Sequence, residues 1–294
     1  MPPRGPHAVN RATLLVLLAY ASAFVLALIV GRTLEGSHPV VVALAADIAA
    51  TVAIFSFSMA FDNSSFYDAY WSVAPIAITG YWCLVPEAAD ATAVRQWLAA
   101  LLVGAWGVRL TYNWCRRWNG LDDEDWRYVD LRVKSGHAWA AVSLAGIHLF
   151  PTLLVFAALL PVYAAVTSPA PLGLLDVVAV VVAIGAIALE TAADQQLRRF
   201  LDGRSDHREI LADGLWAYCR HPNYLGENMF WWGLFLLGLA AAPQWWWSMA
   251  GAVAITAMFV LVSVPMLDQR SLARRPGYDE HMKRVPALLP RVPR

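Results

Sequence analysis

The sequence predicts an all-α protein: a polytopic transmembrane helical bundle of about eight spans, with both termini in the cytoplasm. Of the 294 residues, 59% are hydrophobic and only 15% are charged, whereas roughly a quarter of the residues in a soluble domain are charged. The apolar residues occur in long runs, and the mean hydropathy is +0.49. The net charge is zero, so the composition gives no reason to expect nucleic-acid binding, and the lipid bilayer is the expected partner.

Eight apolar segments have lengths close to the roughly 20 residues that are needed to cross a bilayer. They cover residues 13–31, 40–60, 70–86, 94–114, 139–165, 172–193, 224–241 and 246–266. The first is too long for the apolar core of a secretory signal and has no small-residue cleavage site after it, which predicts a retained helix. The third and seventh are the weakest, and the prolines and glycines inside them, such as Pro75 and Gly233, predict broken or tilted helices.

Basic residues concentrate in three of the connections, which follow the fourth, sixth and eighth apolar segments. The turns at 168–171 and 241–244 carry no charge. Cytoplasmic connections of membrane proteins are rich in Lys and Arg, and eight spans place all three basic loops on that side. We therefore expect residues 1–12 to be a disordered cytoplasmic N-terminus and residues 13–294 to form a single transmembrane domain, with a ligand-binding half at about 109–294.

Polar side chains gather in the stretch 214–227, at the start of the seventh segment. They are Arg220, His221, Asn223, Tyr224 and Glu227. Polar groups are costly in a membrane, so such a cluster indicates a ligand. Pro222 favours a turn that enters a helix, which would aim Asn223, both a donor and an acceptor, at that ligand. The alternative is that Asn223 simply caps the helix.

The sixth segment ends with Glu190, Asp194 and Arg198, which are four residues apart and share one helix face. This spacing fits a ladder of salt bridges, and it also fits carboxylates that accept hydrogen bonds from a ribose or a carboxamide. The loop arginines could bind phosphates in a bidentate manner, although the positive-inside rule alone also accounts for them.

These motifs together resemble the steroid 5-alpha-reductase family, and most closely its bacterial branch of largely uncharacterised membrane proteins. The resemblance rests on the stretches 68–75, 109–114, 124–128, 194–200, 214–227 and 231–233, and it covers about residues 60–290. The combination is specific, although no single motif is. The resemblance implies a multi-pass protein of the bacterial inner membrane that reduces an activated carbon–carbon double bond in a steroid-like or other enone lipid.

The resemblance also implies NADPH, bound between helices from the cytoplasmic side. The expected cofactor-binding residues are Asp194, Arg198, Tyr218, Arg220, His221, Asn223, Tyr224, Glu227, Arg270, Arg275 and Tyr278. Three positions depart from the pattern of the family. Leu197 stands where the bacterial branch often has Lys, Asp268 where Glu is usual, and His281 where a second tyrosine is expected.

The catalytic residues are less well defined by the sequence. Steroid-reducing members polarise the substrate ketone with a Glu and a Tyr in their N-terminal half, and no motif here matches that pair. The candidates are Asp68, Tyr70, Tyr81 and Tyr112. Asp47 and His148 are the ionisable residues that lie deep within a span, and His148 is expected to be a hydrogen-bonded packing residue. The site is expected between spans two to four and the polar start of span seven.

Two other functions stay open at this stage. Membrane methyltransferases that use S-adenosylmethionine carry a similar Arg-His-Pro motif, but Asp194, Asn223 and Glu227 favour the reductase. A transporter or lipid-binding protein would also bury charges, but the chain shows no internal repeat.

No metal is expected, because no two histidines have the spacing of metal ligands and the three cysteines are interpreted as free thiols. The sequence leaves the lipid substrate and the oligomeric state undefined.

Overall fold

The computed structural model describes residues 6–291, and across that range it is helical with no strand, as predicted. The α-helices are α1 (Pro6–Thr33), α2 (Pro39–Ala60), α3 (Tyr70–Leu84), α4 (Ala93–Arg117), α5 (Trp126–Ser135), α6 (Trp139–Val142), α7 (Phe150–Thr167), α8 (Leu174–Gly203), α9 (Pro222–Ala241), α10 (Met249–Met258), α11 (Val264–Arg274) and α12 (Tyr278–Arg284). Two π-helical segments, Ser143–Leu149 and Phe259–Ser263, join α6 to α7 and α10 to α11.

Within the described residues, five helical stretches are long and apolar enough to cross a membrane, so the chain is a multi-pass membrane protein. They are Arg11–Thr33, Pro39–Ala60, Trp126–Thr167, Leu174–Gly203 and Pro243–Arg274. The other three predicted spans correspond to α3, α4 and α9. Both weak segments form unbroken helices, although α3 contains Pro75 and its 15 residues fall short of the roughly 20 that a perpendicular crossing needs.

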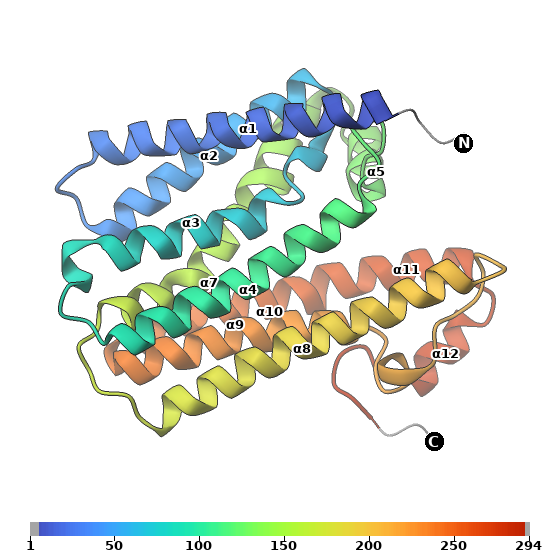
Figure 1. Ribbon diagram of the computed structural model, residues 1–294. Coiled ribbons are helices and arrows are strands. Elements are labelled where there is room, and N and C mark those ends of the chain that lie inside the picture. Colours follow the sequence, from blue (N-terminus) through green and yellow to red (C-terminus); the bar gives the residue numbers. More distant parts are fainter. Residues whose placement is uncertain (1–5, 292–294) are drawn as a thin grey trace.

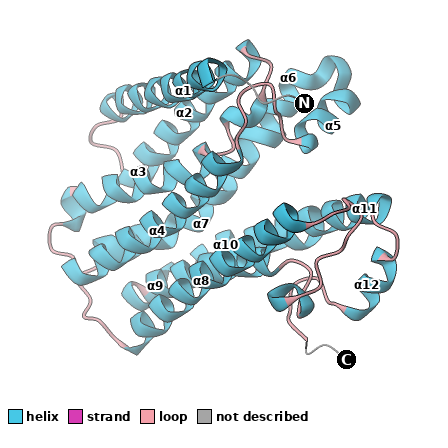
Figure 2. Cartoon of the chain, turned by 45° about the vertical axis from the view of Figure 1, so that its right-hand side comes forward, coloured by secondary structure: helices cyan, strands magenta, loops and turns pink. Residues whose placement is uncertain are grey.

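The long helices run alternately in opposite directions, and both ends of the described chain lie at the same end of the bundle (Figure 1). The short helices α5, α6, α11 and α12 gather at that end too (Figure 2). We call it the basic end, because the three Arg- and Lys-rich connections lie there. Helix α1 already begins at Pro6, inside the segment 1–12 that was expected to be disordered, and residues 1–5 of that segment lie outside the described residues.

Small residues bring the helices of the C-terminal half into close contact. A Cβ atom added at Gly233 of α9 would lie 3.0 Å from the Cβ atom of Ala183 on α8. One added at Gly251 of α10 would lie 2.4 Å from the carbonyl oxygen of Ala157 on α7. Because lipid tails are as apolar as core side chains, such close backbone approach is what favours helix association in a membrane.

The end opposite to the basic end is fastened by a fully buried arginine. Arg95 of α4 donates from Nε and Nη2 to the carboxylate of Asp176 on α8, at 2.7 and 3.1 Å. It also donates to the carbonyl oxygens of Ala170 and Pro171, at 2.7 and 3.0 Å. Asp176 in turn accepts from the backbone amide of Gly173 at the start of α8. This site therefore ties the α7–α8 turn to α4 and fixes the register of α4 against α8.

Candidate functional site

A cavity of about 1500 Å³ opens at the basic end, between α4, α8 and α9 on one side and α5, α7 and α10–α11 on the other. Of the predicted cofactor-binding and catalytic residues, six line it: Asp68, Asp194, Asn223, Tyr224, Glu227 and Arg270. Pockets for one drug-sized ligand usually measure roughly 300–1,000 Å³, so this cavity has room for more than one ligand.

Asp194 is the hub of the polar wall, because its carboxylate links three helices. Its Oδ2 accepts from Arg109 Nη1 and Asn113 Nδ2 of α4, at 3.0 and 2.9 Å. Its Oδ1 accepts from Asn223 Nδ2, at 3.4 Å, in the first turn of α9. Arg109 also forms an ion pair with Glu190, one turn before Asp194 on α8. The four-residue spacing of Glu190 and Asp194 therefore lets both carboxylates pair with one arginine of α4, rather than with basic residues of α8 itself.

A third carboxyl group, that of Glu227, completes this polar wall. Glu227 is 3% exposed, and its two oxygens accept from the indole nitrogens of Trp106 and Trp231, at 3.0 and 2.8 Å. The neighbouring Gly226 permits this placement, since a Cβ atom there would lie 2.8 Å from the Cβ atom of Glu190. Three carboxyl groups thus surround Arg109.

The polar wall contains buried atoms without hydrogen-bond partners among the described residues. They include Oε2 of Glu190 and Nε of Arg109. Both residues are about nine-tenths buried or more, with side-chain exposures of 6% and 10%. A buried polar atom that lacks a partner costs free energy, so such atoms mark a place where a ligand can supply the missing hydrogen bond.

Cations lie at the mouth of the cavity. Arg117, Arg270 and Arg274 line it, and within the described residues none of them forms an ion pair. The guanidinium of Arg270 lies 3.7 Å from the centroid of the Trp126 ring. Arg127, by contrast, is paired with Asp125 at 2.9 Å. Three arginines are therefore free to bind an anion in a bidentate manner.

The other predicted cofactor residues do not line the cavity. Arg220, His221 and Tyr278 are buried around the carboxylate of Asp268. Tyr218 is 44% exposed. The last two of these residues, Arg198 and Arg275, contact neighbours on their own part of the chain. Arg198 pairs with Asp202 across one helical turn, and Arg275 donates to the Ser271 hydroxyl at 3.3 Å.

An acid–tyrosine pair that includes the candidate Tyr70 lies deeper in the bundle, and the sequence had not identified its acidic partner. Tyr70 of α3 donates from its hydroxyl to Asp47 Oδ1 of α2, at 2.7 Å. The hydroxyl of Tyr67 lies 2.8 Å from that of Thr152 on α7. Asp47 and both tyrosines line a cavity of about 10 Å³, and Tyr67 lines the large cavity as well. The sequence feature that pointed to this pair was Asp47, a lone acid in the second apolar segment. Its hydrogen-bond partner Tyr70 could not be predicted from the spacing of the two residues along the chain.

The remaining catalytic candidates are placed differently from one another. Asp68 lines the large cavity and accepts a hydrogen bond from the Tyr128 hydroxyl at 2.8 Å. Burial raises the pKa of Asp68 to about 6, although the Tyr128 hydrogen bond opposes the shift. Tyr112 is 58% exposed, outside the cavity, with the Arg116 guanidinium over its ring. Tyr81 is also exposed.

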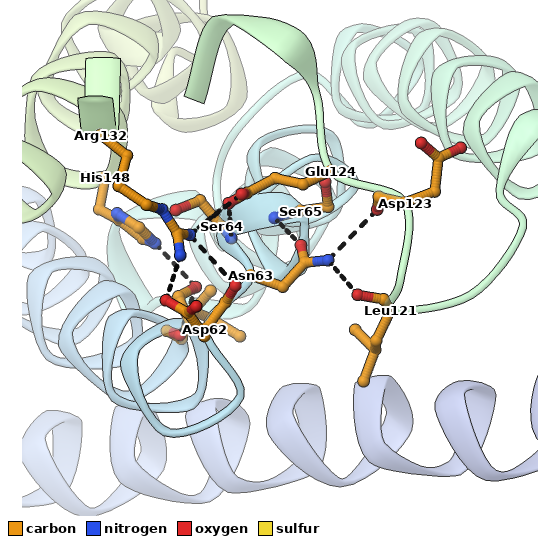
Figure 3. A network of polar contacts seen from close by, with 11 residues as sticks. Asp62, Asn63, Ser64, Ser65, Leu121, Asp123, Glu124, Arg132 and His148 are labelled. Carbon is orange, nitrogen blue, oxygen red and sulfur yellow. Dashed lines mark hydrogen bonds and ion pairs between the residues drawn. The ribbon is translucent and has the colours of Figure 1, made fainter. Parts of the chain in front are cut away.

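The Glu124–Tyr128 motif reaches the cavity through the network in Figure 3. Asn63, after α2, donates to the carbonyl oxygens of Leu121 and Asp123 at 2.6 and 3.2 Å. Glu124 accepts from the backbone amide of Ser64 at 2.7 Å and from Arg132 at 2.9 Å. These contacts fasten the α4–α5 loop to the α2–α3 connection, so the start of α5 forms one wall of the cavity.

His148 is the packing residue that the sequence predicted. It is fully buried in the π-helical segment before α7, where Nε2 lies 3.0 Å from the Ser58 hydroxyl and Nδ1 lies 2.9 Å from the carbonyl oxygen of Ser143. Figure 3 labels His148 together with the residues of the network around Asn63 and Glu124. Both ring nitrogens are therefore satisfied within the protein.

Comparison with known proteins assigns the chain to a family. Residues 54–285 match the family described as "Protein of unknown function (DUF1295)". The chain is 24% identical over 279 residues to "Uncharacterized protein C594.04c" of Schizosaccharomyces pombe, an alignment that covers 87% of this chain and 81% of that protein. No solved structure matches. The chain thus belongs to the DUF1295 family, which is a steroid 5-alpha-reductase-like family.

Proposed function

We propose that this protein is a membrane-embedded, NADPH-dependent reductase of an activated carbon–carbon double bond in an enone lipid. The observation that carries the proposal is the composition of the large cavity. One space joins a wall of carboxyl and amide groups, a mouth of three arginines that form no ion pair with the described residues, and an apolar side. A dinucleotide and a lipid require those three surroundings together.

The polar residues of the cavity fit NADPH. Arg117, Arg270 and Arg274 would hold its phosphates, because a guanidinium forms bidentate hydrogen bonds with phosphate oxygens. Glu190 Oε2, which is buried and has no hydrogen-bond partner within residues 6–291, would accept from the carboxamide of the nicotinamide. The role of Asp194 is to orient Asn223, whose amide faces the same space.

The apolar side of the cavity supports a lipid substrate that arrives from the bilayer. Helices α7 and α10 cross closely where Gly251 meets Ala157. Between that crossing and the basic end, these helices and the π-helical segments that adjoin them form two walls of the cavity. The walls consist of Ile147, Phe150 and Leu154 on one side, and Ile255, Met258 and Val262 on the other. Phe150 and Val262 are 52% and 54% exposed, so the lining continues onto the outer, membrane-facing surface.

Reduction of an enone places three demands on the site. A hydride adds to the β carbon, the carbonyl oxygen gains negative charge, and a proton reaches the α carbon. When bound, NADPH would supply the hydride. We assign the substrate's carbonyl oxygen to Tyr70, and the small cavity beside Tyr70 and Asp47 would receive it. The single hydroxyl proton of Tyr70 would turn from Asp47 to the substrate oxygen when Asp47 is protonated and donates in turn to the Tyr70 oxygen. Trp71, which lines both cavities and packs edge-on against Trp106, would exclude water.

The orientation in the membrane is part of the same proposal. Eight crossings, with both termini and the three basic connections on the cytoplasmic side of a bacterial inner membrane, agree with the alternating helix directions. The cavity then opens toward the compartment that contains NADPH.

The test is titration of the purified protein with NADPH, followed by an NADPH-oxidation screen against a panel of enone lipids in detergent. Asn223→Ala is expected to weaken NADPH binding, whereas Asn119→Ala, an exposed asparagine outside the cavity, is the matched control. Binding of S-adenosylmethionine without NADPH would instead identify a methyltransferase. Lipid flux in proteoliposomes without binding of either cofactor would identify a transporter.

A further inference from the structure

We infer that Asp268 is a positioning residue: its carboxylate fastens the C-terminal segment to the start of α9 and so sets the shape of the site for a dinucleotide phosphate. The identity of the ligand in this inference rests on the proposed function, whereas the positioning role rests on the contacts of Asp268. It gives a different role to Arg220, His221 and Tyr278, which the family resemblance assigned to the cofactor.

Asp268 lies on α11, is 5% exposed, and is surrounded by donors from two other parts of the chain. Its Oδ2 accepts from Arg220 Nη2 at 2.6 Å, and Arg220 Nε lies 3.2 Å from Oδ1. The same Oδ1 accepts from the Tyr278 hydroxyl at 2.8 Å, with His221 Nε2 at 3.2 Å. One carboxylate therefore links α11, the segment before α9 and α12.

All three guanidinium nitrogens of Arg220 donate to acceptors around this cluster. Nε and Nη2 face Asp268, and Nη1 donates to the carbonyl oxygen of Val285. Arg220 is also 8% exposed and does not line the cavity. A phosphate would have to displace several charge-assisted hydrogen bonds to reach it, whereas the three arginines at the cavity mouth are free.

Backbone hydrogen bonds extend the connection along the C-terminal segment. The amide of Arg220 donates to the carbonyl oxygen of Pro286 at 2.9 Å, and that of His221 donates to Ala287 at 3.1 Å. The amide of Arg291 donates back to the carbonyl oxygen of Tyr218 at 3.0 Å. The segment 286–291 thus runs beside residues 218–221, and the Asp268 cluster holds its near end.

This cluster is directly connected to the cavity on two sides. The ring of His221 stacks on that of Tyr224, with centroids 5.6 Å apart, and Tyr224 lines the cavity next to Asn223. On α11, Arg270 and Arg274 flank the cavity mouth within two turns of Asp268. Release of the Asp268 contacts would therefore shift the first turn of α9 and the cationic mouth relative to each other.

The test compares Asp268→Asn with wild-type protein by NADPH titration and, with a lipid substrate, by separation of KM from kcat. We expect NADPH binding to weaken by about ten-fold, which corresponds to about 1.4 kcal/mol. We expect kcat at saturating NADPH to stay within about two-fold, because the groups that face the reacting atoms are unchanged. Asp268→Glu, which restores the residue usual in the family, should recover most of the affinity. Asp279→Asn, which removes an exposed carboxylate that pairs only across one turn of α12, is the matched control.

A second readout requires no cofactor. In Asp268→Asn, the amide hydrogens of Arg220, His221 and Arg291 should exchange with solvent faster than in wild type, while amides at the Arg95 end keep their rates. If Asp268→Asn does not fold, Tyr278→Phe, which removes a single hydrogen bond, takes its place. Wild-type protein that fails to bind NADPH would refute the proposed function, and with it the ligand of this inference. NADPH binding that is equal in wild type and Asp268→Asn would refute the positioning role alone.

Discussion

Two arginines on α4 make equivalent connections to α8 at opposite ends of the bundle, yet their surroundings differ. Arg95 and Arg109 are roughly four helical turns apart, and so are their partners Asp176 and Glu190, because α4 and α8 run in the same direction. Arg95 is 0% exposed and has one carboxylate and two carbonyl oxygens as acceptors. Arg109 shares three carboxyl groups with its neighbours and has a buried Nε without a partner among the described residues.

The difference separates a structural site from a site that is prepared for a ligand. At Arg95 one cation faces one carboxylate, and all three guanidinium nitrogens donate to oxygen atoms of the described chain, so the site offers little to another molecule. At Arg109 three carboxyl groups lie near one cation, and Oε2 of Glu190 has no hydrogen-bond partner among the described residues. Both features reduce the stability of the folded protein, and Glu190 lines the large cavity. Proteins keep such costly arrangements mainly where function requires them. The two sites share their helices and their chemistry, so matched substitutions can test the distinction.

The largest expected effect is at the Arg95 site. Arg95→Met would leave Asp176 buried without its cation, which typically costs about 3–5 kcal/mol. The thermal midpoint in detergent should fall sharply, while the protein that remains folded should bind NADPH as wild type does. The double variant with Asp176→Leu should regain much of the loss, because no buried charge remains. A small effect of Arg95→Met would mean that this site does not fasten the bundle.

The next largest effect tests whether helix contact positions the carboxyl groups. In Gly226→Ala the added methyl group would press on Glu190 and on the carbonyl oxygen of Ala186, and overpacking of this kind costs about 1–3 kcal/mol. Because the added methyl group would displace Glu190, which pairs with Arg109, the affinity for NADPH should drop as well. Gly185→Ala is the control, since a methyl group there meets no atom within 4 Å. Equal NADPH affinity in both variants would show that α8–α9 contact does not shape the site.

The sequence predicted the helical class and a multi-pass membrane protein because long apolar runs report burial in lipid directly. Five helical stretches of the described residues have the length and hydropathy of membrane spans, compared with the eight predicted. The sequence also grouped Asp194, Asn223, Tyr224 and Glu227, which all line the large cavity. Asn223, Tyr224 and Glu227 are close together in the sequence, whereas Asp194 joined them only through the family resemblance. The sequence could not predict that Arg270 lies at the cavity mouth whereas Arg220 is hydrogen-bonded to Asp268. Both are arginines beside a membrane segment, and only the tertiary structure decides which one has a free guanidinium.

Pairings between distant segments were beyond the sequence for the same reason. Arg109 appeared only as part of a resemblance, and its contacts with Glu190 and Asp194 join positions about eighty residues apart. The Asp47–Tyr70 hydrogen bond depends on how α2 and α3 cross, which hydrophobic periodicity does not report. The start of α1 at Pro6 was missed because the prolines in the first residues suggested a disordered segment, although Pro is well tolerated in the first turn of a helix.

A third prediction contrasts stability with binding. Glu190→Gln removes one of three crowded carboxyl charges, so the thermal midpoint should stay the same or rise, while NADPH affinity falls by about ten-fold. Asp176→Asn should do the reverse: it lowers the midpoint and leaves the affinity of folded protein unchanged. Scanning calorimetry and NADPH titration of both variants give the comparison. A lower midpoint for Glu190→Gln would indicate that Glu190 is a structural residue like Asp176.

The smallest effect concerns how the basic end responds to pH, through Asp68 in the connection between α2 and α3. Its carboxyl group faces Tyr128, with Asp125 and Arg127 nearby, and burial raises its pKa to about 6. The folded protein therefore holds this proton more tightly than the unfolded chain, whose Asp has a pKa near the ordinary value of 3.8. The contribution of Asp68 to stability is then greatest below about pH 4 and is lost as the pH rises through about 6.

Asp68→Asn should remove that dependence, so its thermal midpoint in detergent should fall less than that of wild type between about pH 4 and pH 7. Asp213→Asn, an exposed substitution, should keep the wild-type slope. Parallel slopes for Asp68→Asn and wild type would mean that Asp68 is hydrated rather than buried by the α5 wall. In that case the network around Asn63 and Glu124 would not close this side of the cavity, and the basic end would be more open than the contacts in Figure 3 imply.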